Sequence, residues 1–302
     1  MLKGIAAGLA AGALWGLVFL VPRITPGLSA VDLTAGRFIS FGAISALAVL
    51  LTRKSFRRPT LRQAMNALGM SVLGYTGYYL VLAISIVKAG TEVPTLIIGV
   101  IPVWMMIWGK PASLRWPALL PGMALTLAGL GLMTYTSLQA NVFASAVPDS
   151  EASFWIGVGL ALLAMVSWTV FGLVNASWLK THPEVSASTW ANWLGIATGL
   201  GALLMWAVAG SPVNELMALD NLGWLIGICV ATGVSSAWLS TILWNIASQR
   251  LSASLCGQLI VSETIFALIY SFVWDQTWPN GLQVAACVLF LVGILASIRA
   301  HT

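Results

Sequence analysis

Ten apolar runs, each about 20 residues long, constrain this chain more than any other feature of its sequence. A transmembrane helix needs about 20 predominantly apolar residues, whereas a spanning strand needs about 10 and alternates in polarity. Prolines or polar clusters separate most of the runs, as expected of loops. The runs therefore predict ten transmembrane helices, at residues 4–22, 30–51, 64–87, 92–109, 117–138, 153–176, 187–208, 222–246, 252–274 and 280–299.

The composition supports an all-α integral membrane protein in contact with a lipid bilayer. Hydrophobic residues make up 59% of the chain and charged residues only 8%. A soluble domain has about 25% charged residues, so this chain has too little polar surface to cover a water-soluble core. The net charge of +5 comes mostly from short loops between the runs, which indicates membrane topology and argues against nucleic-acid binding.

The distribution of Lys and Arg predicts the orientation. Cytoplasmic loops of membrane proteins are enriched in both residues. If the N-terminus is cytoplasmic, eleven of the fourteen Lys and Arg residues fall on the inner side, and the C-terminus is cytoplasmic as well. These eleven are Lys3, Arg53, Lys54, Arg57, Arg58, Arg62, Lys110, Arg115, Lys180, Arg250 and Arg299.

Weak internal similarity predicts two repeats of five spans. Trp15 in the first half corresponds to Trp168 in the second, and Gly129 corresponds to Gly293, in the same order along the chain. An odd number of spans per repeat turns the second copy upside down in the membrane, and inverted repeats are typical of secondary transporters. We expect a first repeat at 1–138, an extracytoplasmic linker at 139–152 and an inverted second repeat at 153–302.

Four glycines in the first run recur at a spacing of four: Gly4, Gly8, Gly12 and Gly16. This spacing places them on one face of a helix. Small residues on such a face let two helix backbones approach closely. We therefore expect the first helix to pack tightly against another helix through this face.

Several segments together resemble a known family. They are the Trp-containing first helix of each half, Arg37 in "AGRF", "AISIVKAGTEVPTLIIGVIPV" and "GLQVAACVLFLVGILAS". With them the chain resembles the drug/metabolite transporter superfamily, in its EamA-type branch, and within it the bacterial aromatic amino-acid exporters. The resemblance implies ten helices around a central cavity and export of amino acids across the bacterial inner membrane. Where many members carry Gly-Glu and Glu-Pro, this chain has Gly109-Lys110 and Glu263-Thr264, which argues against identical roles for the two halves.

Glu263 is an acidic residue in the middle of an apolar run. A carboxylate near the bilayer centre costs a few kcal/mol and usually faces a cavity or a polar partner. We interpret Glu263 as lining the substrate path, where it contacts an amino group or carries a proton; the alternative is a hydrogen bond that holds helices together. The corresponding residue of the first half is Ile101, so only one half carries the carboxylate.

Aromatic and amide side chains inside the runs are further candidates for a substrate cavity. Aromatic rings can stack on planar side chains and attract an ammonium group, but ordinary helix packing also uses them. Tyr75 and Tyr79 share a helix face at a spacing of four. Arg37 either extends toward the membrane surface or binds a carboxylate. The candidates besides Glu263 are Tyr75, Tyr78, Tyr79, Trp104, Trp168, Trp244 and Gln258.

The sequence contains no P-loop, no evident catalytic Ser/His/Asp set and no Cys/His cluster for a metal. We therefore expect no enzymatic activity, no cofactor and no metal. The favoured hypothesis is a secondary transporter that exports aromatic and other neutral amino acids by alternating access. A broader drug or metabolite exporter on the same scaffold is the alternative. The oligomeric state is left open, since a monomer is sufficient for this mechanism.

Overall fold

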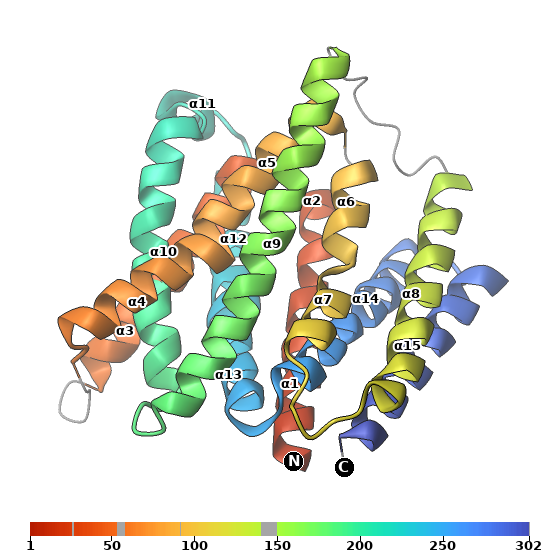
Figure 1. Ribbon diagram of the computed structural model, residues 1–302. Helices are drawn as coiled ribbons and strands as arrows, with labels where there is room; N and C mark the ends of the chain where they lie inside the picture. Colours follow the sequence, from red (N-terminus) through yellow and green to blue (C-terminus); the bar gives the residue numbers. More distant parts are fainter. Residues whose placement is uncertain (26, 53–57, 91, 140–149, 302) are drawn as a thin grey trace.

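The computed structural model describes residues 1–25, 27–52, 58–90, 92–139 and 150–301. Most of the expected linker at 139–152, and the inner-side residues Arg53, Lys54 and Arg57, lie outside these ranges. All regular structure in the described ranges is helical (Figure 1). Nine of the described helices are long and apolar enough to cross a membrane: Leu2–Phe19, Ala30–Leu51, Leu61–Ala89, Trp116–Thr136, Glu151–Thr181, Ala187–Ala209, Leu222–Arg250, Ala253–Asp275 and Gly281–Ala300.

The fourth expected span, 92–109, is interrupted. It forms two short helices, α6 (Glu92–Gly99) and α7 (Ile101–Trp108), which meet at Val100. Pro102 lies in the first turn of α7. A proline has no N–H to donate and its ring clashes with the preceding turn, so it is tolerated at a helix start and breaks a helix interior. The structure thus has a broken helix in the fourth run, where the sequence places Pro94 and Pro102.

The first and third spans of the first half also consist of several helices. The first comprises α1 (Leu2–Gly16), the 3₁₀ turn η1 (Leu17–Phe19) and, beyond it, α2 (Val21–Ile24). The second is α3 (Ala30–Leu51). The third comprises α4 (Leu61–Ser71), the π turn η2 (Val72–Thr76) and α5 (Gly77–Ala89). The fifth is α8 (Trp116–Gln139).

The second half has a similar succession of helices. It begins with α9 (Glu151–Thr181) and α10 (Ala187–Ala209), followed by the short α11 (Val213–Met217). Its third span contains α12 (Leu222–Thr232), the π turn η3 (Gly233–Leu239) and α13 (Ser240–Arg250). The last two helices are α14 (Ala253–Asp275) and α15 (Gly281–Ala300). Both halves therefore have a π turn in the third span, and such turns occur frequently at functional sites.

Helices of the two halves pack against one another in corresponding pairs. α3 packs on α10, α8 on α15 and α7 on α14. α1 packs on α13 and α14, and its counterpart α9 packs on α5 and α6. Figure 1 shows α8 and α15 side by side at one edge of the molecule and α3 with α10 at the other. These contacts agree with two similar five-helix halves, while the repeat boundaries remain a prediction.

The glycine face of α1 packs against α14 and the end of α13, which confirms the prediction of close approach. A Cβ atom at Gly16 would lie 2.9 Å from the backbone nitrogen of Ala267. A Cβ atom at Gly12 would clash with the Ser262 hydroxyl and lie 3.1 Å from the backbone nitrogen of Glu263. The absence of side chains on this face therefore sets how closely α1 approaches the turn that carries Glu263.

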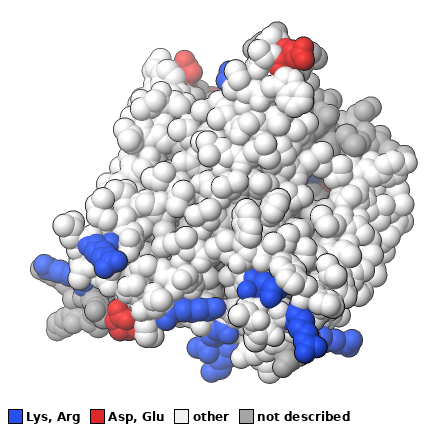
Figure 2. All heavy atoms as spheres, viewed as in Figure 1, with Lys and Arg blue, Asp and Glu red and all other residues white. Residues whose placement is uncertain are grey.

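Charged residues gather at the two ends of the molecule. Lys and Arg side chains cluster at the end that carries both termini, and acidic side chains lie mainly at the opposite end (Figure 2). On the face shown, charge between these ends is visible only as a small patch at the bottom of a hollow (Figure 2). This distribution agrees with cytoplasmic termini under the positive-inside rule. The orientation remains a prediction.

Candidate functional site

Glu263 lies at the midpoint of α14, beside the glycine face of α1. Its carboxylate is surrounded by protein atoms, yet the residue keeps part of its accessible surface. No hydrogen bond or ion pair to this carboxylate is present in the described part of the chain. An unpaired carboxylate in mid-membrane usually faces a polar, hydrated space. The contacts thus favour the interpretation of Glu263 as a lining residue over that of a helix-to-helix link.

Arg37 on α3 lies in the interior and does not extend to the membrane surface. Its side chain is 7% exposed, and its Nε has no hydrogen-bond partner among the described residues. The guanidinium carbon lies 4.8 Å from the ring centre of Phe38 and 5.1 Å from that of Tyr79. Cation–π attraction to these rings holds the charge between the helices. The alternative of a side chain extended toward the interface is therefore wrong.

Arg37 and Glu263 lie within electrostatic range of each other and of Tyr78. Even so, they do not form an ion pair in the described structure. Tyr78 is buried and its ring centre lies 5.1 Å from that of Tyr79. The two charges thus belong to one interior region, which these tyrosines of α5 also border.

Tyr75 links this region to the second half. Its hydroxyl lies 2.8 Å from Oγ1 of Thr241 on α13. Its ring packs edge-on against Phe38 of α3 and Phe171 of α9, with ring centres 5.7 and 5.4 Å away. Tyr79 also contacts Phe38, at 5.2 Å, so Tyr75 and Tyr79 share a face as their spacing predicts. The contacts of Tyr75 thus join four helical segments: η2, α3, α9 and α13.

Three tryptophans from three spans form a second aromatic group. The ring centres of Trp15 and Trp244 are 5.3 Å apart, and Trp168 lies 6.5 Å from Trp15 and 6.4 Å from Trp244. Trp15 and Trp168 are the pair that the internal similarity matches, and they meet in space. Trp168 and Trp15 are half-buried, whereas Trp244 is fully buried. Trp168 also contacts Phe171, at 6.0 Å, which connects the two aromatic groups.

Trp104 and Gln258 are not part of these ring contacts, although Trp104 packs against the same hydrophobic core as the three tryptophans. The Trp104 ring packs against Trp108 of the same helix, at 4.8 Å. Gln258 is fully buried; its amide donates to Oγ1 of Thr126 on α8 at 2.9 Å, and its carbonyl oxygen accepts from Oγ of Ser297 on α15 at 3.1 Å. The amide thus joins α14 to the α8–α15 pair, as amides in membrane helices commonly do, and a place for Gln258 in the substrate cavity stays a prediction.

We expect Gln258→Leu to lower stability while leaving substrate affinity unchanged. The substitution leaves two buried hydroxyls without their amide partner, at a cost of about 1 kcal/mol in the free energy of unfolding. Thermal unfolding in detergent measures the first effect and the transport KM measures the second. A several-fold rise in KM without loss of stability would place Gln258 in the substrate site instead.

Sequence reasoning missed a buried polar network. Asn175 on α9 donates to Oδ1 of Asn245 on α13 at 3.1 Å, and it accepts from Nε1 of Trp190 on α10 at 2.7 Å. All three side chains are fully buried. Amides within apolar runs are the signal that would have found this network. Since its groups satisfy one another, we interpret it as a rigid junction of three helices.

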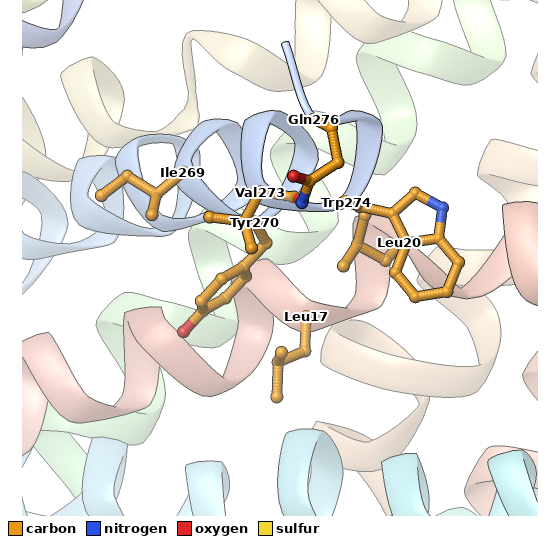
Figure 3. A pocket seen from close by; sticks show the side chains of 7 residues that line it. All are labelled: Leu17, Leu20, Ile269, Tyr270, Val273, Trp274 and Gln276. Atoms are coloured by element: carbon orange, nitrogen blue, oxygen red, sulfur yellow. The ribbon is translucent and has the colours of Figure 1, made fainter. Parts of the chain in front are cut away.

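An apolar hollow lies near the end of α14. It has a volume of about 550 Å³ and Figure 3 shows its lining, in which residues of α14 face the η1 segment. The lining residues are Leu17, Leu20, Ile269, Tyr270, Val273, Trp274 and Gln276. Tyr270 lies seven residues after Glu263, on the same helix face and about 10 Å further along the axis. The hollow is therefore two turns from Glu263, toward the end opposite the termini.

No group of His, Cys, Asp and Glu within the described ranges is placed to hold a metal ion.

Comparison with known proteins agrees with this architecture. The chain is 31% identical over 313 residues to a protein of Escherichia coli (strain K12) described as "Inner membrane protein YtfF", and the match covers 99% of this chain and 96% of that protein. A biotin transporter of Salmonella typhimurium is 27% identical over 154 residues, which is 49% of this chain and 47% of the transporter. A solved crystal structure has the same fold, with a TM-score of 0.73 over 99% of this chain and 98% of that chain, at 18% identity.

The EamA-like transporter family matches residues 155–299, which span α9 to α15. This is the part of the chain that carries Glu263. The first half lies outside that match but within the alignment to the E. coli protein, which is nearly full length. Together these similarities show that the chain belongs to the EamA-like transporter family.

Proposed function

We propose that this protein is a secondary transporter that exports amino acids, aromatic and other neutral ones, by alternating access between its two halves. The position of Glu263 carries the proposal, because a half-buried mid-span carboxylate with no partner among the described residues is suited to bind a transported ammonium group. The surrounding tyrosines and tryptophans suit an aromatic side chain. The choice of amino acids, and of export as the direction, follows from the resemblance to the aromatic amino-acid exporter YddG.

The bacterial inner membrane is the proposed location. The E. coli relative is described as an inner membrane protein, and nine described helices are suited to span a bilayer. Family membership also supports transport rather than enzymatic chemistry.

A broader metabolite transporter is the second candidate, because one observation favours it. The relative from Salmonella typhimurium, which matches 49% of this chain, is a biotin transporter, and biotin carries a carboxylate but no ammonium group. A substrate with a carboxylate and no ammonium group would bind to Arg37 and would not need Glu263.

Counterflow in proteoliposomes tests the proposed function. Vesicles that contain the purified protein are loaded with unlabelled phenylalanine, threonine or biotin, and the entry of each labelled compound is followed with and without a pH gradient. We expect saturable counterflow of phenylalanine. Counterflow of biotin with no movement of either amino acid would select the broader alternative.

A further inference from the structure

We propose that Arg37 and Glu263 bind the two charged groups of one substrate, the guanidinium holding its carboxylate and the Glu263 carboxylate holding its ammonium group. The inference rests on the proposed transport function. It assigns the recognition of zwitterionic α-amino acids to two charged side chains, one from each half of the chain. Arg37 thereby becomes a substrate-binding residue, and the transported species carries both charges.

Arg37 is a buried cation with no anionic partner in the described part of the chain. Its side chain is 93% buried, its Nε has no partner among the described residues, and no carboxylate forms an ion pair with it there. A buried charge is stable only when it is paired or hydrated. A guanidinium presents donors in a planar fork that matches a carboxylate, so an unfilled fork in the interior is suited to that ligand.

The aromatic neighbours of Arg37 fix its guanidinium in place. Phe38 and Tyr79 both lie about 5 Å from its central carbon, on α3 and α5. Tyr79 packs against Phe38 as well, so the two rings support each other. A charge held in this way loses little freedom when a ligand binds, which favours affinity.

Glu263 supplies the complementary charge from α14, in the other half of the chain. Arg37 acts electrostatically on Glu263, yet no ion pair joins the two side chains in the described part of the chain. α3 packs mainly on α10, whereas α14 packs on α1 and α7, so the charges are held on different sets of helices. A zwitterion between them neutralises both at once, and a substrate with one charge leaves the other unpaired.

Three substrates that share one phenyl ring test this assignment: phenylalanine, 2-phenylethylamine without the carboxylate, and 3-phenylpropionate without the ammonium group. In proteoliposomes the wild-type protein is expected to transport phenylalanine with a kcat/KM about 10- to 100-fold above that of either analogue, as expected when a hydrogen bond to a charged group is lost. Arg37→Gln is expected to remove the preference over phenylethylamine, mainly through KM. Glu263→Gln is expected to remove the preference over phenylpropionate.

Two further variants keep the test decisive. Arg115→Gln removes an exposed Arg from the loop before α8 and is expected to preserve the wild-type preferences. Arg37→Lys keeps the charge without the planar fork, so it serves if Arg37→Gln fails to fold, and we expect its preference for phenylalanine over phenylethylamine to fall by about tenfold. A wild-type preference in the folded Arg37 variant, while phenylalanine is still transported, overturns this inference alone. A wild-type protein that moves no amino acid overturns the proposed function as well.

Discussion

Transport of amino acids is expected to fall by about 10- to 100-fold when Glu263 is replaced by Gln, because a charge-assisted hydrogen bond to the substrate is lost. Gln has nearly the same shape as Glu, and no described hydrogen bond to this carboxylate is broken. The helix should therefore keep its packing on α1 while its mid-span charge disappears. Initial uptake rates in proteoliposomes, at matched protein density, measure the effect.

Glu184→Gln is the matched control for that experiment. Glu184 lies exposed in the loop between α9 and α10, so the same chemical change occurs far from the proposed site. We expect wild-type uptake from this variant. If folded Glu263→Gln protein also transports at the wild-type rate, the carboxylate has no role in transport and the proposed site is wrong.

A second large effect is expected when Gly12 is replaced by Leu. The new Cβ would meet the Ser262 hydroxyl and approach the backbone nitrogen of Glu263, at 3.1 Å. Overpacking of this kind costs about 1–3 kcal/mol in the free energy of unfolding and displaces the backbone. Since the displaced turn carries Glu263, transport should fall together with the unfolding temperature in detergent.

Gly227→Leu provides the comparison. A Cβ at Gly227 on α12 has no atom within 4 Å, and the residue is exposed on the helix surface. Leu also forms helices more readily than Gly, by roughly 0.8–1 kcal/mol. We expect this variant to be as stable as the wild-type protein or more so. If Gly12→Leu and Gly227→Leu have the same unfolding temperature and the same transport rate, the α1–α14 contact does not depend on the glycine face.

Features that depend on burial in lipid could be predicted from the sequence. Apolar runs give the spans because backbone groups in lipid must satisfy their hydrogen bonds within a helix. The spacing of four in α1 predicted a close helix contact, since that spacing fixes a face regardless of the partner. Trp15 and Trp168 were matched by similarity alone and are found in contact, at 6.5 Å.

Features that depend on the partner of a side chain could not be predicted. Gln258 and Glu263 are five residues apart on one helix, yet the first is fully buried in hydrogen bonds to two helices and the second has none in the described structure. Arg37 was equally ambiguous, because only the packing of Phe38 and Tyr79 determines whether the guanidinium extends outward or lies inside. The π turns could not be predicted, because an apolar run does not show which backbone carbonyl accepts the hydrogen bond from each N–H.

One ion pair connects the segment after η1 with the end of α14. Arg23 and Asp275 are 2.7 Å apart and each is more than 40% exposed. Exposed pairs contribute about 0.2–1 kcal/mol, which changes the ratio of two conformations by no more than about fivefold. Without substrate, an ion pair of this strength favours the conformation in which the segment after η1 and the end of α14 are in contact, at the end opposite the termini. Thermal motion nevertheless breaks the pair readily. Since dissolved salt screens such a pair, the resting population should depend on ionic strength.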